Sequence, residues 1–281
     1  MTGALQLRAP AKVNFRLDVL NRRTDGYHNL RMLMQRIDLC DEIELRLTKQ
    51  AGISVHSDSA ALPEGAGNIV WKAAAAILAR TDSRSGVDIN ITKKIPIAAG
   101  LGGGSSDAAA TLMGLNQLLA LGLDDTQLMK IGLSLGADVP FFIFQKTAIA
   151  EGVGEILTAI EKVPKVWLVL VNPGIHVSTS WVFQSLRLTT EKVAAKIPFL
   201  YESAADLCGI LSNDLEAVTI SRFPVIQAIK DQLMAVGASG ALMSGSGPTV
   251  FAVFDERTAA QKAAIKLSET PGWFTAALST I

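Results

Sequence analysis

Apolar residues occupy every second position over residues 11–19, with polar residues between them. This period of two predicts a half-buried strand with one polar face. The same alternation predicts a strand over 86–92, and 42–47 is expected to be another strand. The apolar positions of 30–37 fit a helix or a strand equally well.

Helical spacing appears first at Trp71, Ala75 and Leu78, and it predicts a helix over 68–80. Further helices are expected over about 106–121 and 124–135, followed by a short element over 138–144. In the second half, the pattern predicts strands over 166–171, 241–243 and 249–254 and helices over 204–217, 223–236 and 257–267. Because strands and helices interleave throughout, the expected class is α/β or α+β.

The chain is long enough for two domains of ordinary size, since it has 281 residues and a domain takes roughly 150. The segment Glu-Lys-Val-Pro-Lys over 161–165 precedes a new buried strand and is the best candidate boundary. We therefore expect one domain over 1–162 and a second over 163–281.

Composition removes several classes of protein. The 26 basic residues balance the 26 acidic ones, which disfavours a protein that binds nucleic acid by neutralising phosphates. A hydrophobic content of 49% excludes a disordered chain. No apolar run approaches the roughly 20 residues that span a bilayer, and the first residues do not resemble a signal peptide. We expect a cytoplasmic protein, either a monomer or a weak homodimer, without nucleic-acid or membrane partners.

The segment 96–111 contains glycines at 100, 102, 103 and 104, followed by Ser105 and Ser106. Glycines allow backbone N–H groups to approach a ligand closely, and a following helix directs its free N–H groups to the same place. Together these features predict an anion site, most naturally for phosphate. The alternative is a tight turn with Ser or Asp as the helix N-cap. Four glycines in five positions favour the anion site.

The known phosphate loops do not match this segment. A P-loop needs Gly-Lys-Ser/Thr, and no lysine lies between Ile95 and Gly122. The spacing of the dinucleotide fingerprint places Ser105 or Asp107 where a small residue is needed. The loop of protein kinases precedes a His-Arg-Asp segment that this chain lacks.

Pro96-x-x-x-Gly-Leu-Gly-Gly-Gly-Ser-Ser resembles the phosphate loop of the galactokinase, homoserine kinase, mevalonate kinase and phosphomevalonate kinase superfamily. The segment over 243–250 resembles the third glycine motif of that superfamily. Three more segments resemble the branch whose alcohol substrate carries a cytidine diphosphate: Pro10-Ala-Lys-Val-Asn14, Asp25-Gly-Tyr-His28 and Gly136-Ala-Asp-Val-Pro-Phe-Phe142. The resemblance covers most of the chain and thins between about 184 and 210.

The resemblance implies a two-domain α+β kinase fold. Its N-terminal nucleotide-binding domain would have a left-handed βαβ-type, S5-like topology, and its C-terminal domain would be a ferredoxin-like α/β domain. The implied reaction is ATP-dependent phosphorylation of the C2 hydroxyl of a cytidine-diphosphate-linked methylerythritol in the non-mevalonate isoprenoid pathway. The implied cofactors are ATP and Mg²⁺. The metal ligands stay unknown, with Ser106 as a candidate.

Two residues are candidates for catalysis. Asp138 could orient or deprotonate the attacking hydroxyl, or it could equally cap the helix that Pro140 opens. Lys12 lies on the polar face of the first strand together with Asn14, where a solvated lysine is the alternative. The resemblance makes Lys12 and Asp138 the catalytic pair, and an ammonium near Asp138 would favour its charged form.

The candidate ATP-binding residues surround the glycine loop. Asn68 could contact adenine, as the resemblance implies, or cap a helix. The set is Asn68, Pro96, Ala98, Ala99, Gly100, Leu101, Gly102, Gly103, Gly104, Ser105, Ser106 and Asp107.

The candidate residues for the alcohol substrate include Tyr27 and His28. A tyrosine ring can stack on a base, and an imidazole can bond to its polar edge. The resemblance implies a second aromatic wall at Phe183, with Trp181 as the alternative. The set is Asn14, Tyr27, His28, Asp138, Thr179, Phe183, Gly245 and Ser246.

Other readings stay open. A turn between strands is the alternative at Gly245, and Asn213 with Asp214 is expected only to cap a helix. A kinase for another small alcohol, such as mevalonate or homoserine, would keep the same fold. A non-catalytic nucleotide sensor is a second alternative, and a nicotinamide-dependent oxidoreductase is a third.

Overall fold

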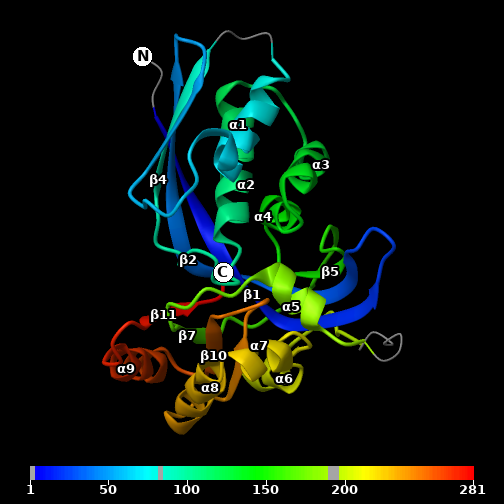
Figure 1. Ribbon diagram of the computed structural model, residues 1–281, viewed down its shortest axis with the longest axis vertical. Helices are drawn as coiled ribbons and strands as arrows, with labels where there is room; N and C mark the ends of the chain where they lie inside the picture. Colours follow the sequence, from blue (N-terminus) through cyan, green and yellow to red (C-terminus); the bar gives the residue numbers. More distant parts are fainter. Residues whose placement is uncertain (1–3, 82–84, 189–195) are drawn as a thin grey trace. The chain divides into compact units, whose positions relative to one another are not determined.

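The computed structural model describes residues 4–81, 85–188 and 196–281 (Figure 1). The chain forms two compact units, each made of three separate segments. The first comprises Met1–Ala11, Leu39–Ile97 and Gly102–Gln145, and the second comprises Lys12–Asp38, Ala98–Leu101 and Lys146–Ile281. Since both units are discontinuous, the boundary expected after residue 162 stays a prediction.

In the first unit, strands and helices form two layers (Figure 1). Strand β4 (Gly86–Thr92) pairs antiparallel with the last part of β2 (His28–Thr48) and parallel with β3 (Ile53–Ser57). The first part of β1 (Leu5–Arg22) also belongs to this unit. The helical elements are η1 (Gly65–Gly67), α1 (Ile69–Leu78), α2 (Gly103–Leu118), α3 (Asp125–Leu135) and α4 (Val139–Phe144).

Helix α2 lies close against the strands because it carries a glycine where they meet. A Cβ atom at Gly114 would be 2.4 Å from Leu7 Cδ1 and 2.5 Å from Leu45 Cδ1. The buried face of α2 is built mainly from small residues such as Ala108 and Ala109, which permit this close approach. The start of α2, and with it the glycine loop, is therefore held firmly relative to β1 and β2 within the unit.

In the second unit, the remaining parts of β1 and β2 are extended by three short strands, β5, β6 and β8. Strand β2 pairs antiparallel with β5 (Ala148–Gly152), which pairs with β6 (Ile156–Ala159). Strand β1 pairs parallel with β8 (Ser212–Asn213). Helices α5 (Thr179–Ser185), α6 (Ala204–Gly209) and α7 (Glu216–Arg222) belong to the same unit.

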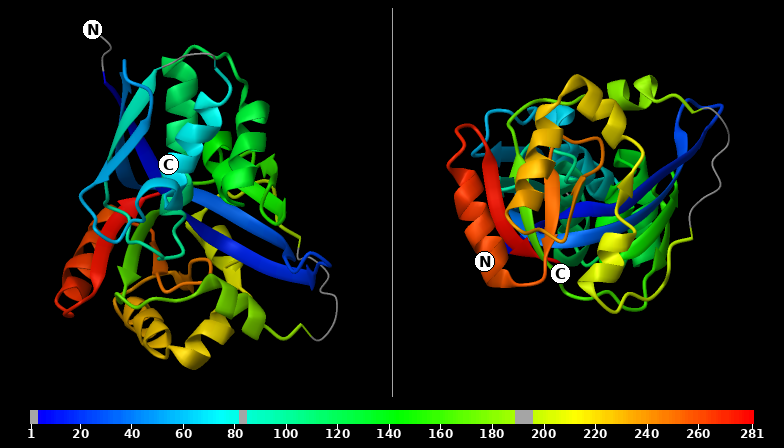
Figure 2. Two further views of the ribbon diagram at one scale, coloured as in Figure 1. Left: turned by 45° about the horizontal axis from the view of Figure 1, so that its top comes forward. Right: turned by 90° about the horizontal axis from the view of Figure 1, so that it is seen from below.

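A separate antiparallel sheet of four strands completes the second unit. Its strands are β7 (Trp167–Asn172), β9 (Gly240–Met243), β10 (Val250–Phe254) and β11 (Phe274–Ser279), in the spatial order β11-β7-β10-β9. Helix α8 (Val225–Ala235) precedes β9, and α9 (Arg257–Ser268) connects β10 to β11 (Figure 2). This succession of strands and helices is the ferredoxin-like arrangement that the resemblance implied.

The core of the second unit depends on aromatic and aliphatic residues from strands that are distant in sequence. Phe15 of β1 and Phe251 of β10 are fully buried, and their rings meet edge to face at 5.7 Å.

Among the described residues, no helix has both the length and the apolar character needed to cross a membrane.

Most of the expected elements are present in the structure, and a few differ. The α+β class, the strand over 86–92 and the helices over 68–80, 124–135, 223–236 and 257–267 are confirmed to within a few residues. The ambiguous segment 30–37 is part of β2. The sequence pattern did not predict the short strands β3, β5 and β6 or the last strand, β11.

The prediction of one continuous helix over 204–217 is wrong. The chain forms α6, then the short strand β8, then α7. Ser212 and Asn213 pair with Arg16 and Leu17 of β1, and the Asp214 carboxylate accepts a hydrogen bond of 2.8 Å from the Val19 N–H. These contacts with β1 hold the segment in an extended form that its local helical propensity does not indicate.

Candidate active site

The glycine loop presents an uncapped helix end. Helix α2 begins at Gly103, three residues earlier than expected, and its N-cap is Gly102 in the left-handed conformation, with φ 70° and no side-chain cap. The interpretation of Ser105, Ser106 or Asp107 as the N-cap is therefore wrong. The first N–H groups of this 16-residue helix stay available to an anion.

The residues after Gly104 lie in the first turns of α2. Ser105 is half-buried, whereas Ser106 and Asp107 are fully buried. The Ser106 hydroxyl oxygen has no hydrogen-bond partner among the described residues. A buried hydroxyl without a partner costs free energy, which a ligand bound to this oxygen would recover.

Asp107 faces a buried lysine. Its carboxylate oxygen Oδ2 lies 2.8 Å from Lys93 Nζ, which also forms an ion pair with Asp41 of β2. The other oxygen of Asp41 accepts hydrogen bonds from the backbone N–H groups of Lys94, at 2.6 Å, and Ile95, at 2.8 Å. This buried triad of Asp41, Lys93 and Asp107 therefore links the segment that enters the glycine loop to the helix that leaves it.

The triad carries two carboxylates and one ammonium. Burial raises the pKa of Asp107 to about 7, an effect that the Lys93 charge opposes and the Asp41 charge reinforces. Although burial acts to lower it, the pKa of Lys93 is raised, since both carboxylates favour the charged ammonium. Both shifts describe one cation shared by two acids in a site of low solvent access.

Asn68 and Asp138 have different local roles in the first unit. Asn68 is the N-cap of α1, and its side-chain oxygen accepts a hydrogen bond of 2.9 Å from the Val70 N–H. The capping interpretation of Asn68 is thus confirmed, and its amide nitrogen is not used by this cap. Asp138 occupies the N-cap position of α4, but its side chain makes no capping hydrogen bond. Its half-buried carboxylate is therefore not committed to that helix.

In the second unit, Lys12 and Asn14 form a buried polar pair on β1. Lys12 Nζ donates a hydrogen bond of 2.7 Å to the Asn14 side-chain oxygen, and both residues have almost no solvent exposure. The Asn14 amide also contacts Met32 Sδ at 3.4 Å. The interpretation of Lys12 as a solvated strand residue is therefore wrong, since its ammonium is held in a fixed position.

Part of the glycine loop belongs to this second unit. The Leu101 carbonyl accepts a hydrogen bond of 2.9 Å from the Lys12 N–H, so the loop lies along β1. Ala98 is exposed and has φ 54°, a conformation that costs a non-glycine residue free energy. Ala99 and Leu101 are buried and anchor the loop, while Pro96 lies just before it.

The two glycine motifs of the chain touch each other. Ser244 Oγ donates a hydrogen bond of 3.0 Å to the Gly100 carbonyl. A Cβ atom at Gly100 would lie only 2.3 Å from the Ser244 carbonyl oxygen, and Gly100 also has φ +75°. Gly245 lies beside the same residue and close to the Asn14 side chain. The predicted turn between β9 and β10 is thus confirmed, and it also contacts and supports the glycine loop at Gly100.

Ser246 and Thr179 are brought together at the same turn. Their hydroxyl oxygens are 2.8 Å apart, which connects the first residue of α5 to the second glycine motif. Asn213 holds this motif from the other side, because its amide donates to the carbonyls of Met243, at 2.8 Å, and Gly245, at 2.7 Å.

His28 stacks on Phe183 and not on Trp181. The ring centroids of His28 and Phe183 are 5.1 Å apart with an interplanar angle of 24°. Trp181 instead meets Phe223 edge to face at 6.2 Å and carries the Arg222 guanidinium over its ring. Desolvation, and then the Arg22 charge, lower the pKa of His28, so the imidazole is neutral at neutral pH. Tyr27 is 63% exposed.

Comparison with known families gives this arrangement its context. The model of the GHMP kinase N-terminal domain matches residues 68–146, and the model of the GHMP kinase C-terminal domain matches 197–271. Together these matches cover more than half of the chain. The chain belongs to the GHMP kinase family.

Full-length relatives within the GHMP kinases define the branch. The chain is 60% identical to the 4-diphosphocytidyl-2-C-methyl-D-erythritol kinase of Geobacter sp. (strain M21) and 61% identical to that of Geobacter sulfurreducens, over 99% of each chain. A crystal structure of 4-(cytidine 5'-diphospho)-2C-methyl-D-erythritol kinase superposes with a TM-score of 0.82 at 34% identity, covering 98% of this chain and 99% of the other. The two-domain α+β kinase fold that the resemblance implied is confirmed.

Some residues that hold the candidate site in place belong to none of the sequence motifs. Asp41 and Lys93 position the ends of the glycine loop, and Asn213 positions the second glycine motif. Asn213 also accepts a hydrogen bond of 3.0 Å from the Leu215 N–H, but the N-cap of α7 is Leu215 itself, without a side-chain cap, so the expected capping by Asn213 and Asp214 is wrong. No local pattern marks Asp41, because its partners lie more than 50 positions further along the chain.

Proposed function

We propose that this chain transfers the γ-phosphoryl group of ATP to the C2 hydroxyl of 4-diphosphocytidyl-2-C-methyl-D-erythritol, giving the 2-phosphate and ADP. The observation that carries the proposal is the identity of about 60% over 277 residues with kinases of that name. The intact Lys12–Asn14 pair and the uncapped start of α2 support it.

In this proposal, the glycine loop and the start of α2 hold the triphosphate. Backbone N–H groups and the helix end supply donors and a partial positive charge without a formal cation. Asn68 would offer its uncommitted amide to adenine. The proposed ATP-binding set is unchanged, except that Asp107, which is paired with Lys93, would position the loop.

Mg²⁺ would enter with ATP. Ser106 fits a ligand role, because its buried hydroxyl oxygen has no partner among the described residues and hard oxygen ligands suit this cation. When bound, the cation would neutralise charge on the β- and γ-phosphates.

Asp138 would orient the C2 hydroxyl, whose oxygen forms the new bond to the γ-phosphorus while the bond to the β–γ bridging oxygen breaks. The hydroxyl proton would pass to the Asp138 carboxylate and ADP would leave. Lys12 would stabilise the charge that develops on the transferred group. Asn14 would contribute by holding the Lys12 ammonium in place, which removes the entropy cost of ordering it during the reaction.

The cytosine would be read by Tyr27, His28 and Phe183. The 5.1 Å spacing of His28 and Phe183 is that of two rings in direct contact, so the base would stack on an outer face of this pair. A neutral imidazole can both donate to and accept from the cytosine edge. Exposed Tyr27 would cover the base from the other side. Thr179, Gly245 and Ser246 would contact the polyol and its diphosphate.

We also propose that the chain acts in the cytoplasm, as a monomer or weak homodimer, without binding nucleic acid. The balanced charge supports the last point.

The test is ADP release by the purified protein with Mg·ATP and each of three alcohols: the cytidyl methylerythritol compound, mevalonate and homoserine. Release with the cytidyl compound alone is expected. Release with only another alcohol would retain a kinase and overturn the proposed cytosine pocket. ATP binding without turnover of any alcohol would favour a nucleotide sensor.

A further inference from the structure

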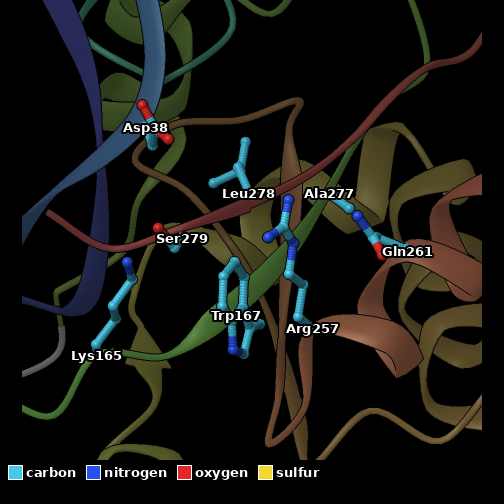
Figure 3. Close-up of a pocket in the computed structure, with 8 residues that line it drawn as sticks. All are labelled: Asp38, Lys165, Trp167, Arg257, Gln261, Ala277, Leu278 and Ser279. Carbon is cyan, nitrogen blue, oxygen red and sulfur yellow. The ribbon is translucent and has the colours of Figure 1, made fainter.

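The second unit carries a pocket of about 270 Å³ at the edge of its four-stranded sheet (Figure 3). Trp167, at the start of β7, forms its floor, and Ser279 of β11 pairs with this residue. Arg257 and Gln261 from the first turns of α9 form one wall. None of the pocket residues belongs to the sets proposed for ATP or the alcohol substrate.

Two cations flank the indole ring. Lys165 Nζ and the Arg257 guanidinium carbon each lie 5.4 Å from the ring centroid of Trp167. Figure 3 shows the ring between the two side chains. Each cation is attracted to the indole, and the ring holds them on either side of it, where a ligand with two anionic ends could reach both.

The pocket has an excess of positive charge. Neither Lys165 nor Arg257 takes part in an ion pair within residues 4–81, 85–188 and 196–281. Asp38, at the end of the second-unit part of β2, is the one carboxylate among the pocket residues. Two cations and one carboxylate give the pocket a net positive charge, which favours a ligand with more than one negative charge.

The shape and chemistry restrict that ligand further. A guanidinium can bind a phosphate through two parallel hydrogen bonds, and an ammonium binds it as a point charge. The Gln261 amide adds a donor, and the indole face with Leu278 adds apolar surface. The volume is smaller than that of typical sites for large ligands, which excludes a whole nucleoside triphosphate.

We infer that this pocket binds a small anion bearing a phosphate or diphosphate group, held between Lys165 and Arg257 beside Trp167. The site is separate in its residues from the proposed kinase function and does not depend on it. The ligand is a dianionic or more highly charged phosphate with at most a small apolar part.

The test is isothermal titration calorimetry with inorganic diphosphate, at fixed ionic strength and without divalent cations, in protein saturated with ADP. The wild-type chain is expected to bind one diphosphate. The double variant Lys165→Gln with Arg257→Gln is expected to bind at least ten-fold more weakly. The matched control is Lys262→Gln with Lys266→Gln, which removes the same charge from exposed positions of α9 and should change affinity less than two-fold.

Three further probes identify the ligand class. Phenyl phosphate should bind at least as tightly as inorganic phosphate, and Trp167→Leu should weaken phenyl phosphate more than diphosphate. Acetate should bind more weakly than either phosphate. The inference is overturned if the wild type binds no diphosphate, if both double variants lose affinity equally, or if acetate binds as well as diphosphate. Because the comparison is between variants, its outcome is independent of whether the chain proves to be a kinase.

Discussion

Lys93 Nζ lies 2.8 Å from the carboxylate of Asp107 and shares its charge with Asp41, in a site where the side chains of all three residues are at least nine-tenths buried. Asp107 belongs to the first turns of α2 and Lys93 follows β4, so this contact spans the glycine loop. The geometry of the glycine loop therefore depends on the charge balance of Asp41, Lys93 and Asp107 as well as on its glycines.

The first prediction concerns removal of the shared cation. Lys93→Met should destabilise the fold by about 3–5 kcal/mol, because it leaves two buried carboxylates without a counter-charge. Lys94→Met is the matched control, since the Lys94–Glu42 pair is half-exposed and should contribute less than about 1 kcal/mol. Urea unfolding of the two variants measures the difference. Equal losses of unfolding free energy in the two variants would show that the buried triad contributes no more to stability than the exposed Lys94–Glu42 pair.

The second prediction concerns pH. The folded chain raises the pKa of Asp107 from its ordinary 3.8 to about 7. Between these values the folded state retains a proton that the unfolded state has lost, so this contribution to stability is present at low pH and disappears as pH rises through 7. Asp107→Asn should therefore gain stability relative to wild type between pH 5 and pH 8, as measured by urea unfolding.

The control for this pH effect is Asp206, whose pKa is lowered by hydrogen bonds from backbone N–H groups of Glu202 and Ser203. Asp206→Asn should change stability by the same amount at pH 5 and pH 8, because Asp206 titrates below that range. Parallel curves for the Asp107 and Asp206 variants would contradict the assignment.

The third prediction separates catalysis from helix capping. Asp138→Ala should reduce turnover by about 10²–10⁴ with little change in melting temperature, because its carboxylate makes no cap to α4. Asp124 caps α3 through a hydrogen bond of 2.8 Å from the Gln127 N–H. Asp124→Ala should therefore show the opposite pattern, a loss of about 1 kcal/mol in stability with nearly normal turnover. Normal turnover in the Asp138 variant would remove it from the mechanism.

The fourth prediction compares two aromatic residues on α5. Phe183→Ala should raise KM for the cytidyl substrate, because loss of a stacking partner costs about 1–3 kcal/mol per base. KM for ATP should stay within about two-fold. Trp181→Ala should leave both constants nearly unchanged, since its ring packs against Phe223. A larger effect at Trp181 would place the cytosine elsewhere.

The fifth prediction concerns the contact between the two glycine motifs. Gly100→Ala should destabilise the chain and raise KM for ATP, because the new methyl group would lie 2.3 Å from the Ser244 carbonyl oxygen. Gly237→Ala is the control, because Gly237 also has a positive φ, +94°, but open space around it. It should lose only the about 1–2 kcal/mol typical of a left-handed residue with a Cβ atom. Equal thermal shifts would show that conformation alone explains the requirement for Gly100.

Regular elements with a strong local signal could be predicted from the sequence. The strand over 86–92 was bounded correctly because its alternation is uninterrupted, and the helix over 124–135 because Asp124 and Gln127 form a capping box. The helix over 204–217 could not be predicted correctly, because β8 exists only through its pairing with β1.

The same limit applies to the site. The glycine pattern made the glycine loop a candidate, and the family resemblance made Lys12 and His28 candidates. Neither the pattern nor the resemblance could identify Asp41 or choose between Phe183 and Trp181. Those assignments depend on which residues face one another across the second unit or within the first, and sequence separation hides such contacts.

The discontinuous make-up of the two units has a consequence for synthesis on the ribosome. The first unit has all its residues once Gln145 has been made, whereas the second needs residues 12–38 and 98–101 together with 146–281. The second-unit parts of β1 and β2 must therefore wait for their later partners, β8 and β5, while the intervening segment is translated. The nascent chain can thus complete helix α2 well before the parts of β1 and β2 that carry Lys12, Asn14 and His28 meet β8 and β5.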